Sequence, residues 1–180
     1  MTTFEIRPAK PWHCGQMSRL LRREHHEAAL RVGLDSRRGL RDIYGQSYYR
    51  RAWFIDGDLA GLGGVKGSLL SPSGFVWVAL SQKATRYPKA IIQEARRQLD
   101  FLMQTHRELH TTIIGGDEAA KRLVIHLGFH VTDHGEGAAG YTRYGRKRLA
   151  DFIDREPAIR IPFGNSFAVC MGYHPEMGDG

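Results

Sequence analysis

The chain has 180 residues, of which 42% are hydrophobic and 25% are charged, and this suits one globular domain with a full core. Every apolar run is shorter than the roughly 18 residues of a membrane-spanning helix, and the first residues lack the apolar segment of a signal peptide. These features argue against a membrane protein and predict a cytoplasmic one. The formal net charge of +7 favours polyanionic partners, but it does not separate nucleic acid from phosphorylated small molecules.

The first part of the chain predicts one strand followed by two helices. Phe4–Arg7 alternates apolar and charged residues, as a short strand does. Apolar side chains at helical spacing predict a helix over Trp12–Leu21, and the pattern allows it to continue to Val32. A shorter helix follows, and either Asp35 or Ser36 is placed to cap its N-terminus.

Three strands are predicted next. Tyr48–Ile55 is rich in aromatic and β-branched residues, and the turn Asp56–Asp58 connects it to a partner strand over Leu59–Leu69. The glycines of this partner strand predict a bulge or the close approach of another backbone. Phe75–Leu80 is apolar throughout, which predicts a central strand that is covered on both faces.

The second half of the chain alternates helices and strands. Pro88 suits the first position of a helix, because its missing N–H would have no partner there, and an apolar stripe follows it. Leu109–Ile114 is a short β-branched strand. Asp117 is then placed to cap a helix that ends at Gly128, and Phe129 leads into the next strand.

This order of elements predicts an α+β fold in which helices cover both faces of a mixed sheet. We assign residues 1–148 to this domain and residues 149–180 to a C-terminal extension. Within the extension, Ile159–Met171 has two β-like runs around Gly164-Asn165. They predict a hairpin that packs on the domain or on a second copy of the chain, as in a homodimer.

The segment Gly115–Val131 carries a family resemblance. It reads GGDEAAKRLVIHLGFHV, in which Asp117 opens a helix and Leu127-Gly128-Phe129 ends it. With the strand pair that precedes it, this segment resembles the GCN5-related N-acetyltransferase (GNAT) family over most of the chain. The resemblance implies an α/β/α sandwich whose sheet is mostly antiparallel with a parallel central pair. It also implies acetyl-CoA as co-substrate and direct transfer of the acetyl group to an amine of a small molecule or peptide.

The acyl-CoA loop of the family falls on Thr85–Ala90. In the family it reads Arg or Gln, two residues, Gly, any residue, and then Gly or Ala. Here Thr85 replaces the first residue and Pro88 replaces the glycine, which removes one N–H from the loop. Arg86 and Lys89 can restore the attraction for phosphate through their charge.

The other site residues are also assigned through the resemblance. Many family members carry a Tyr as general acid toward the CoA thiolate, and Val124 stands at that position here. As the catalytic base we favour Glu27 first and His25 second, on the helix expected to wall the acceptor side. The residues expected to bind the cofactor are Val78, Leu80, Thr85, Arg86, Lys89, Ala90 and Asp117.

The sequence leaves two hypotheses of function, and neither involves a metal site. His126, His130 and His134 are spaced by four, but the predicted helix ends before the second of them, so we expect no metal site. The segment from Val76 to Arg96 resembles acetyltransferase-like proteins of phages and prophages, whose catalytic activity is not clear. The chain is therefore either an acyl-CoA-dependent N-acetyltransferase or a non-catalytic protein of the same fold with a binding or virion-associated role.

Overall fold

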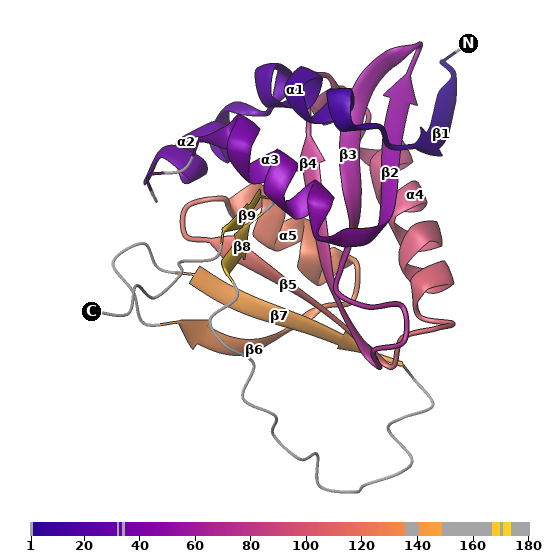
Figure 1. Ribbon diagram of the computed structural model, residues 1–180, viewed down its shortest axis with the longest axis vertical. Coiled ribbons are helices and arrows are strands. Elements are labelled where there is room, and N and C mark those ends of the chain that lie inside the picture. The colour runs from indigo at the N-terminus through magenta and orange to yellow at the C-terminus, as the bar shows by residue number, and fades with distance from the viewer. Residues whose placement is uncertain are drawn as a thin grey trace, which may run out of the picture.

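The computed structural model describes residues 2–31, 33, 35–135, 141–148, 167–169 and 171–173. Their elements in chain order are β1 (Phe4–Pro8), α1 (Pro11–Leu20), α2 (Arg23–Arg31), α3 (Ser36–Gly45), β2 (Ser47–Ile55), β3 (Asp58–Lys66), β4 (Ser73–Leu80), the 3₁₀ helix η1 (Gln82–Arg86), α4 (Pro88–Leu102), β5 (Glu108–Ile114), α5 (Glu118–His126), β6 (His130–Gly135), β7 (Tyr141–Lys147), β8 (Phe167–Val169) and β9 (Met171–Tyr173). Figure 1 shows their arrangement.

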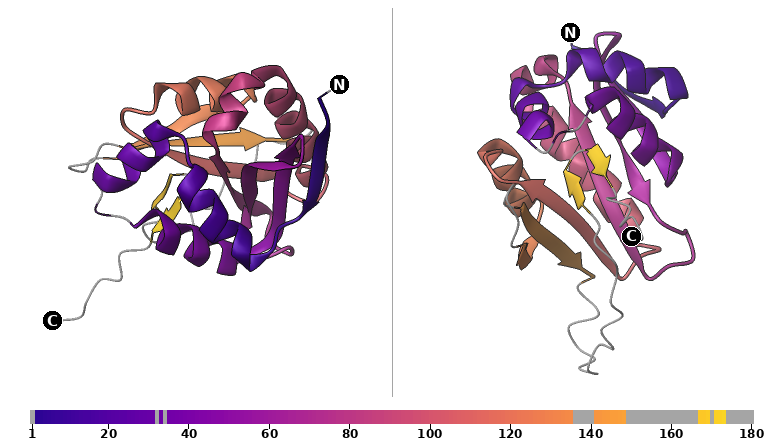
Figure 2. Two further views of the ribbon diagram at one scale, coloured as in Figure 1. Left: turned by 90° about the horizontal axis from the view of Figure 1, so that it is seen from above. Right: turned by 60° about the vertical axis from the view of Figure 1, so that its left-hand side comes forward.

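The described residues form one large sheet with the strand order β1-β2-β3-β4-β5-β7-β6. β4 and β5 run parallel, and the other neighbouring strands pair antiparallel. The helices α1, α2 and α3 lie on one face of this sheet, and α4 and α5 lie on the other (Figure 2). The predicted α/β/α sandwich with a parallel central pair is therefore confirmed.

The two faces of the sheet bury two separate apolar layers, and β4 contributes to both. Trp77 and Ala79 pack toward α1 and α3, whereas Val76, Val78 and Leu80 pack on the side of α4 and α5. This alternation follows from the period of two along a strand. Burial of such a side chain stabilises the fold by about 1.5–3 kcal/mol, so both layers hold β4 at the centre.

The helix predicted over Trp12–Leu21 is present as α1, but it does not continue, because the chain begins a second helix, α2, at Arg23. Between α1 and α2, Leu21 makes an isolated bridge with Ser81, and the Arg22 N–H donates to the Leu80 carbonyl at 3.0 Å. The backbone groups of Leu21 and Arg22 therefore bond to the end of β4, and they do not make the hydrogen bonds that would continue the helix. The segment between Leu80 and Pro88 also differs from the predicted loop, since residues 82–86 form η1.

The predicted turn and the predicted close approach between β2 and β3 are both confirmed. Asp56 and Gly57 have positive φ angles of 50° and 82°, as the tight turn of a hairpin requires. A Cβ atom on Gly64 would lie 2.2 Å from the carbonyl oxygen of Tyr49, so only glycine fits there. β3 is shorter than predicted, since it ends at Lys66.

The described part of the C-terminal extension consists of the antiparallel strands β8 and β9. β8 lies against β5, and β9 lies against α3 and β4. The turn predicted at Gly164-Asn165 lies outside the described residues. Within the described residues, no helix combines the length and the apolar character needed to cross a membrane.

Candidate functional site

An opening separates β4 from β5 in the middle of the sheet. The two strands pair only at their beginnings, where Ser73–Phe75 faces Glu108–His110, and they diverge beyond these residues (Figure 2, right). The remainder of β4, from Val76 to Leu80, therefore has no strand partner on this side among the described residues. A sheet edge of this kind presents backbone donors and acceptors to a ligand.

The backbone of Val78 faces this opening. Residues along an antiparallel pair alternate between exchanging hydrogen bonds with the partner strand and pointing away from it. The Ser81 N–H donates to the Ala60 carbonyl of β3 at 2.9 Å, so in the continuous register of β3 and β4 the backbone groups of Val78 and Leu80 point toward β5. The Leu80 carbonyl is occupied by the Arg22 N–H, as described above.

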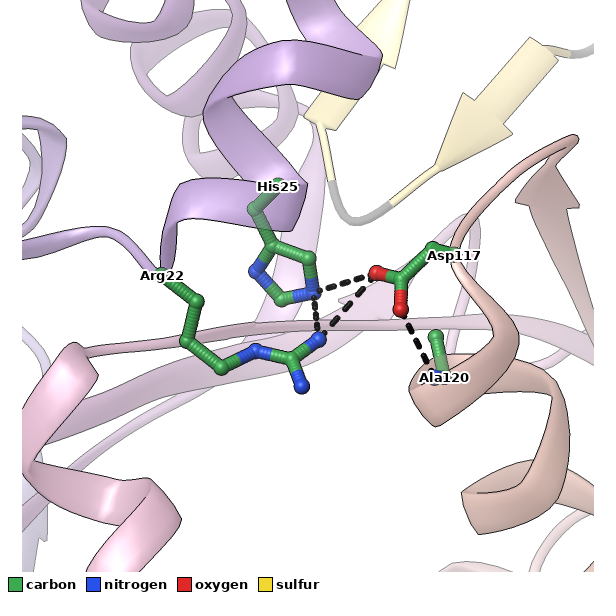
Figure 3. A network of polar contacts seen from close by, with 4 residues as sticks. All are labelled: Arg22, His25, Asp117 and Ala120. Atoms are coloured by element: carbon green, nitrogen blue, oxygen red, sulfur yellow. Dashed lines mark hydrogen bonds and ion pairs between the residues drawn. The ribbon is translucent and has the colours of Figure 1, made fainter.

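A buried polar network closes the wide end of the opening (Figure 3). Arg22 Nη2 lies 3.1 Å from Asp117 Oδ2 and 2.6 Å from His25 Nε2. His25 Nε2 lies 3.3 Å from the same carboxylate oxygen. Asp117 Oδ1 accepts a hydrogen bond of 2.8 Å from the Ala120 N–H and so caps α5, as the sequence predicted. The network thus joins α2 to the start of α5.

The Asp117 carboxyl stays ionised although the residue is only 1% exposed. Burial alone raises the pKa of its carboxyl, but the His25 ring, the Ala120 N–H and the Arg22 guanidinium together bring that pKa below its usual value. The carboxylate is therefore ionised at neutral pH. It serves as the counter-charge of Arg22 and contacts the His25 ring.

An apolar cavity of about 80 Å³ lies beside the opening on the side of α4 and α5. Val78 and Leu80 of β4 line it together with Thr111 of β5. Leu123 and Val124 of α5 form another part of its wall, and neither side chain carries a proton donor. The cavity is thus bordered by both strands that flank the opening, and it can accept an apolar part of a ligand.

Four of the predicted cofactor-binding residues gather around the start of α4. Thr85 and Arg86 belong to η1, whereas Lys89 and Ala90 stand in the first turn of α4, which begins at Pro88 as predicted. Arg86 and Lys89 are both exposed, and neither makes an ion pair with a described residue. Because a helix N-terminus carries about half a positive charge, this corner has the electrostatics of an anion site.

The structure separates the two candidates for the base. His25 is 1% exposed and belongs to the network at the wide end of the opening. Glu27 instead points along the outer surface of α2, where its Oε1 lies 2.7 Å from Arg23 Nε. Asp117, which was predicted to bind the cofactor, lies beside His25 and Arg22.

Sequence reasoning missed Arg22, which is 7% exposed although it stands among charged, exposed neighbours. Nothing local marks it, because its position depends on the bond to Leu80 at the end of β4. Cys14 is not a candidate nucleophile, since burial raises its pKa to about 11. Cys170 lies outside the described residues. No group of three potential metal ligands gathers in the part of the chain that the structure describes.

No protein-family model matches the chain, and neither does a curated protein. Solved structures do match it. RimL, the ribosomal L7/L12 α-N-protein acetyltransferase in complex with coenzyme A, is 15% identical with a TM-score of 0.62, over 83% of this chain and 96% of that one. The spermidine N-acetyltransferase of Vibrio cholerae, in complex with CoA and spermine, is 12% identical with a TM-score of 0.60, over 84% and 98%.

A third match is an acetyltransferase of the GNAT family from Streptococcus pneumoniae, at 14% identity and a TM-score of 0.52, over 81% of this chain and 99% of that one. The chain has the GNAT fold. Sequence identities of this size show that two proteins share a fold, but they do not show that they share an activity.

Proposed function

We propose that the chain is an acyl-CoA-dependent N-acetyltransferase, which takes the acetyl group of acetyl-CoA and passes it directly to an amine. The observation that carries this proposal is the opening between β4 and β5, into which the N–H and C=O of Val78 point. Proteins of the same fold have been solved with coenzyme A, among them RimL and the Vibrio cholerae enzyme.

In this proposal the free edge of β4 holds the pantetheine arm of the cofactor. An extended chain with amide groups pairs with such an edge as an added strand would. The Val78 N–H would donate to a carbonyl of the cofactor and polarise it if that carbonyl belongs to the thioester. The phosphates would lie at the start of α4, where Arg86 and Lys89 supply charge in place of the N–H that Pro88 lacks.

The reaction needs a group that takes a proton from the amine. The amine nitrogen attacks the carbonyl carbon of the thioester, the new C–N bond forms, and the C–S bond breaks with the electron pair leaving on sulfur. We assign the proton to His25, because it stands at the opening while Glu27 is engaged by Arg23 on the outer surface. Asp117 positions the ring, as a carboxylate commonly does for a catalytic histidine.

The acceptor would approach from the face of the sheet that carries α2, since the cofactor would lie on the side of α4 and α5. β8 lies against β5 on the described part of this route, and β9 lies against α3 and β4. Matched structures include a protein N-acetyltransferase and a polyamine N-acetyltransferase. We therefore propose a primary amine of a small molecule or of a peptide as the acceptor.

Hydrogen exchange with and without acetyl-CoA tests the proposal without knowledge of the acceptor. Saturating acetyl-CoA should slow exchange of the Val78 amide at least tenfold. The Trp77 and Ala79 amides point toward β3 and serve as internal controls, since they should be protected in both samples. If calorimetry gives no heat of binding at millimolar acetyl-CoA and the Val78 amide stays unprotected, the proposal is refuted.

In a second candidate function, the chain binds acetyl-CoA but does not catalyse acetyl transfer. The loop before α4 has lost one N–H at Pro88, and Val124 offers no proton to a leaving thiolate. Both features fit a non-catalytic protein of the GNAT fold with a binding role. Acetyl-CoA binding without turnover over a panel of polyamines, amino sugars and peptides would favour this candidate, and the release of free CoA with any one of them would exclude it.

A further inference from the structure

We propose that Arg22 stabilises the negative charge that develops on the sulfur of CoA when the acyl group leaves. This inference rests on the proposed function, because it assigns one more residue to the same reaction.

Arg22 spans the wide end of the opening from one strand to the other. Its main-chain N–H donates to the carbonyl of Leu80, the last residue of β4, at 3.0 Å. Its guanidinium reaches Asp117, which follows β5 and caps α5, at 3.1 Å. Val78 stands two residues before Leu80 on the same edge of β4, so Arg22 is placed at the end of the free edge that would hold the ligand.

The guanidinium still has donors to offer. Both of its contacts, to Asp117 and to His25, use Nη2. Nε is buried and has no hydrogen-bond partner among the described residues. Nη1 points away from both partners (Figure 3). A buried donor of a charged group without an acceptor is costly, so a bound acceptor atom at this place would be favoured.

The step itself calls for a fixed positive charge. When the C–S bond breaks, the electron pair stays on sulfur, and the amine proton has gone to the base rather than to the leaving group. A guanidinium does not release a proton in proteins, so Arg22 acts on the thiolate through its charge and its N–H groups. Leu123 and Val124, which line the neighbouring cavity on the side of α5, carry no proton donor for the leaving thiolate.

The absorbance of bound CoA in the ultraviolet tests this directly, because the thiolate and the thiol absorb differently. In the wild type, the nearby charge should lower the pKa of the bound thiol, so that the thiolate fraction at pH 7 is about tenfold that of free CoA. In Arg22→Gln this increase should vanish while CoA still binds. Arg19→Gln, an exposed arginine in the last turn of α1, is the matched control and should behave as the wild type.

Arg22→Gln alone leaves Asp117 buried without its counter-charge, so this variant can fail to fold. The double variant Arg22→Gln with Asp117→Asn removes both charges together, which buried pairs tolerate far better. It should bind CoA and show the ordinary thiol pKa. If CoA binds and its thiol titrates alike in the wild type and the double variant, the role of Arg22 is overturned and the proposed function stands. If the wild type gives no heat of binding with millimolar CoA, the proposed function fails, and this inference fails with it.

Discussion

Asp117→Asn is the substitution that probes the network most directly. It keeps the size of the side chain and an oxygen that can accept the Ala120 N–H, so the cap of α5 is retained. It removes the negative charge, however, and leaves the Arg22 guanidinium 7% exposed and uncompensated. Breaking a buried ion pair by removing one partner costs about 3–5 kcal/mol, so we expect a loss of about 3 kcal/mol in the free energy of unfolding.

Urea denaturation of the variant and of a matched control measures this loss. Asp35 caps α3 through a hydrogen bond of 2.7 Å from the Arg38 N–H, and it is exposed and outside any buried pair. Asp35→Asn makes the same chemical change and should cost less than about 0.5 kcal/mol, since Asn and Asp are equally good caps. Equal losses in Asp35→Asn and Asp117→Asn would refute the reasoning, because the carboxylate would then count only as a cap.

The pH dependence of the same comparison gives an independent check. The pKa of Asp117 is lower in the folded chain than in the unfolded one. Its ionised carboxylate therefore contributes fully to the free energy of unfolding when the pH is above the pKa of the unfolded state, and this contribution is lost as the pH falls through the pKa of the folded state. The difference between wild type and Asp117→Asn should be constant from about pH 7 to 5 and shrink below about pH 4. A difference that shrinks near neutral pH would mean that another group is responsible.

Three further predictions follow from the fold and the start of α4. Arg86→Ala should raise the dissociation constant of acetyl-CoA, measured by calorimetry, about tenfold, which is equivalent to about 1.4 kcal/mol. Arg107→Ala is the control, since Arg107 is exposed and lies just before β5, and it should leave this dissociation constant unchanged. Acetyl-CoA at 100 times its dissociation constant should stabilise the chain by about 2.7 kcal/mol in denaturation, and no shift would contradict binding. Gly64→Ala should lower the free energy of unfolding by more than about 2 kcal/mol, because the new Cβ would lie 2.2 Å from the Tyr49 carbonyl oxygen. Gly45→Ala is the control: its Cβ would meet open space, and the free energy of unfolding should change by less than about 1 kcal/mol. Equal stability of these two variants would contradict the close approach.

Much of the fold was accessible from the sequence because its signals are local. Asp117, and either Asp35 or Ser36, were predicted as caps from their place before a helical pattern, and Asp117 and Asp35 accept the expected backbone hydrogen bond. Gly128 has a positive φ of 85° just after α5, as the end of a helix requires. Such features need only the neighbouring residues, so single positions in the sequence reveal them.

The candidate site was less accessible, because its geometry depends on contacts between distant residues. The break between α1 and α2 exists because Leu21 meets Ser81, sixty positions further along the chain. That break turns Arg22 inward, whereas its neighbour Arg23 is exposed, although both look alike in sequence. His25 and Asp117 were each singled out for separate reasons, and only the fold showed that they contact one another.

The partial pairing of β4 with β5 also bears on how stiff the sheet is. Among the described residues, β4 and β5 pair only at Ser73–Phe75, next to the Pro72 carbonyl that accepts from the N–H groups of Arg107 and Glu108, so this end can act as a hinge between β1–β4 and β5–β7. At the other end, side chains rather than backbone set the angle between the halves, through Arg22 and Asp117. The apolar core that both halves share on the side of α4 and α5 also holds them together, so the ion pair of Asp117 with Arg22 is one contribution to the width of the gap, and protonation of Asp117 would weaken that contribution.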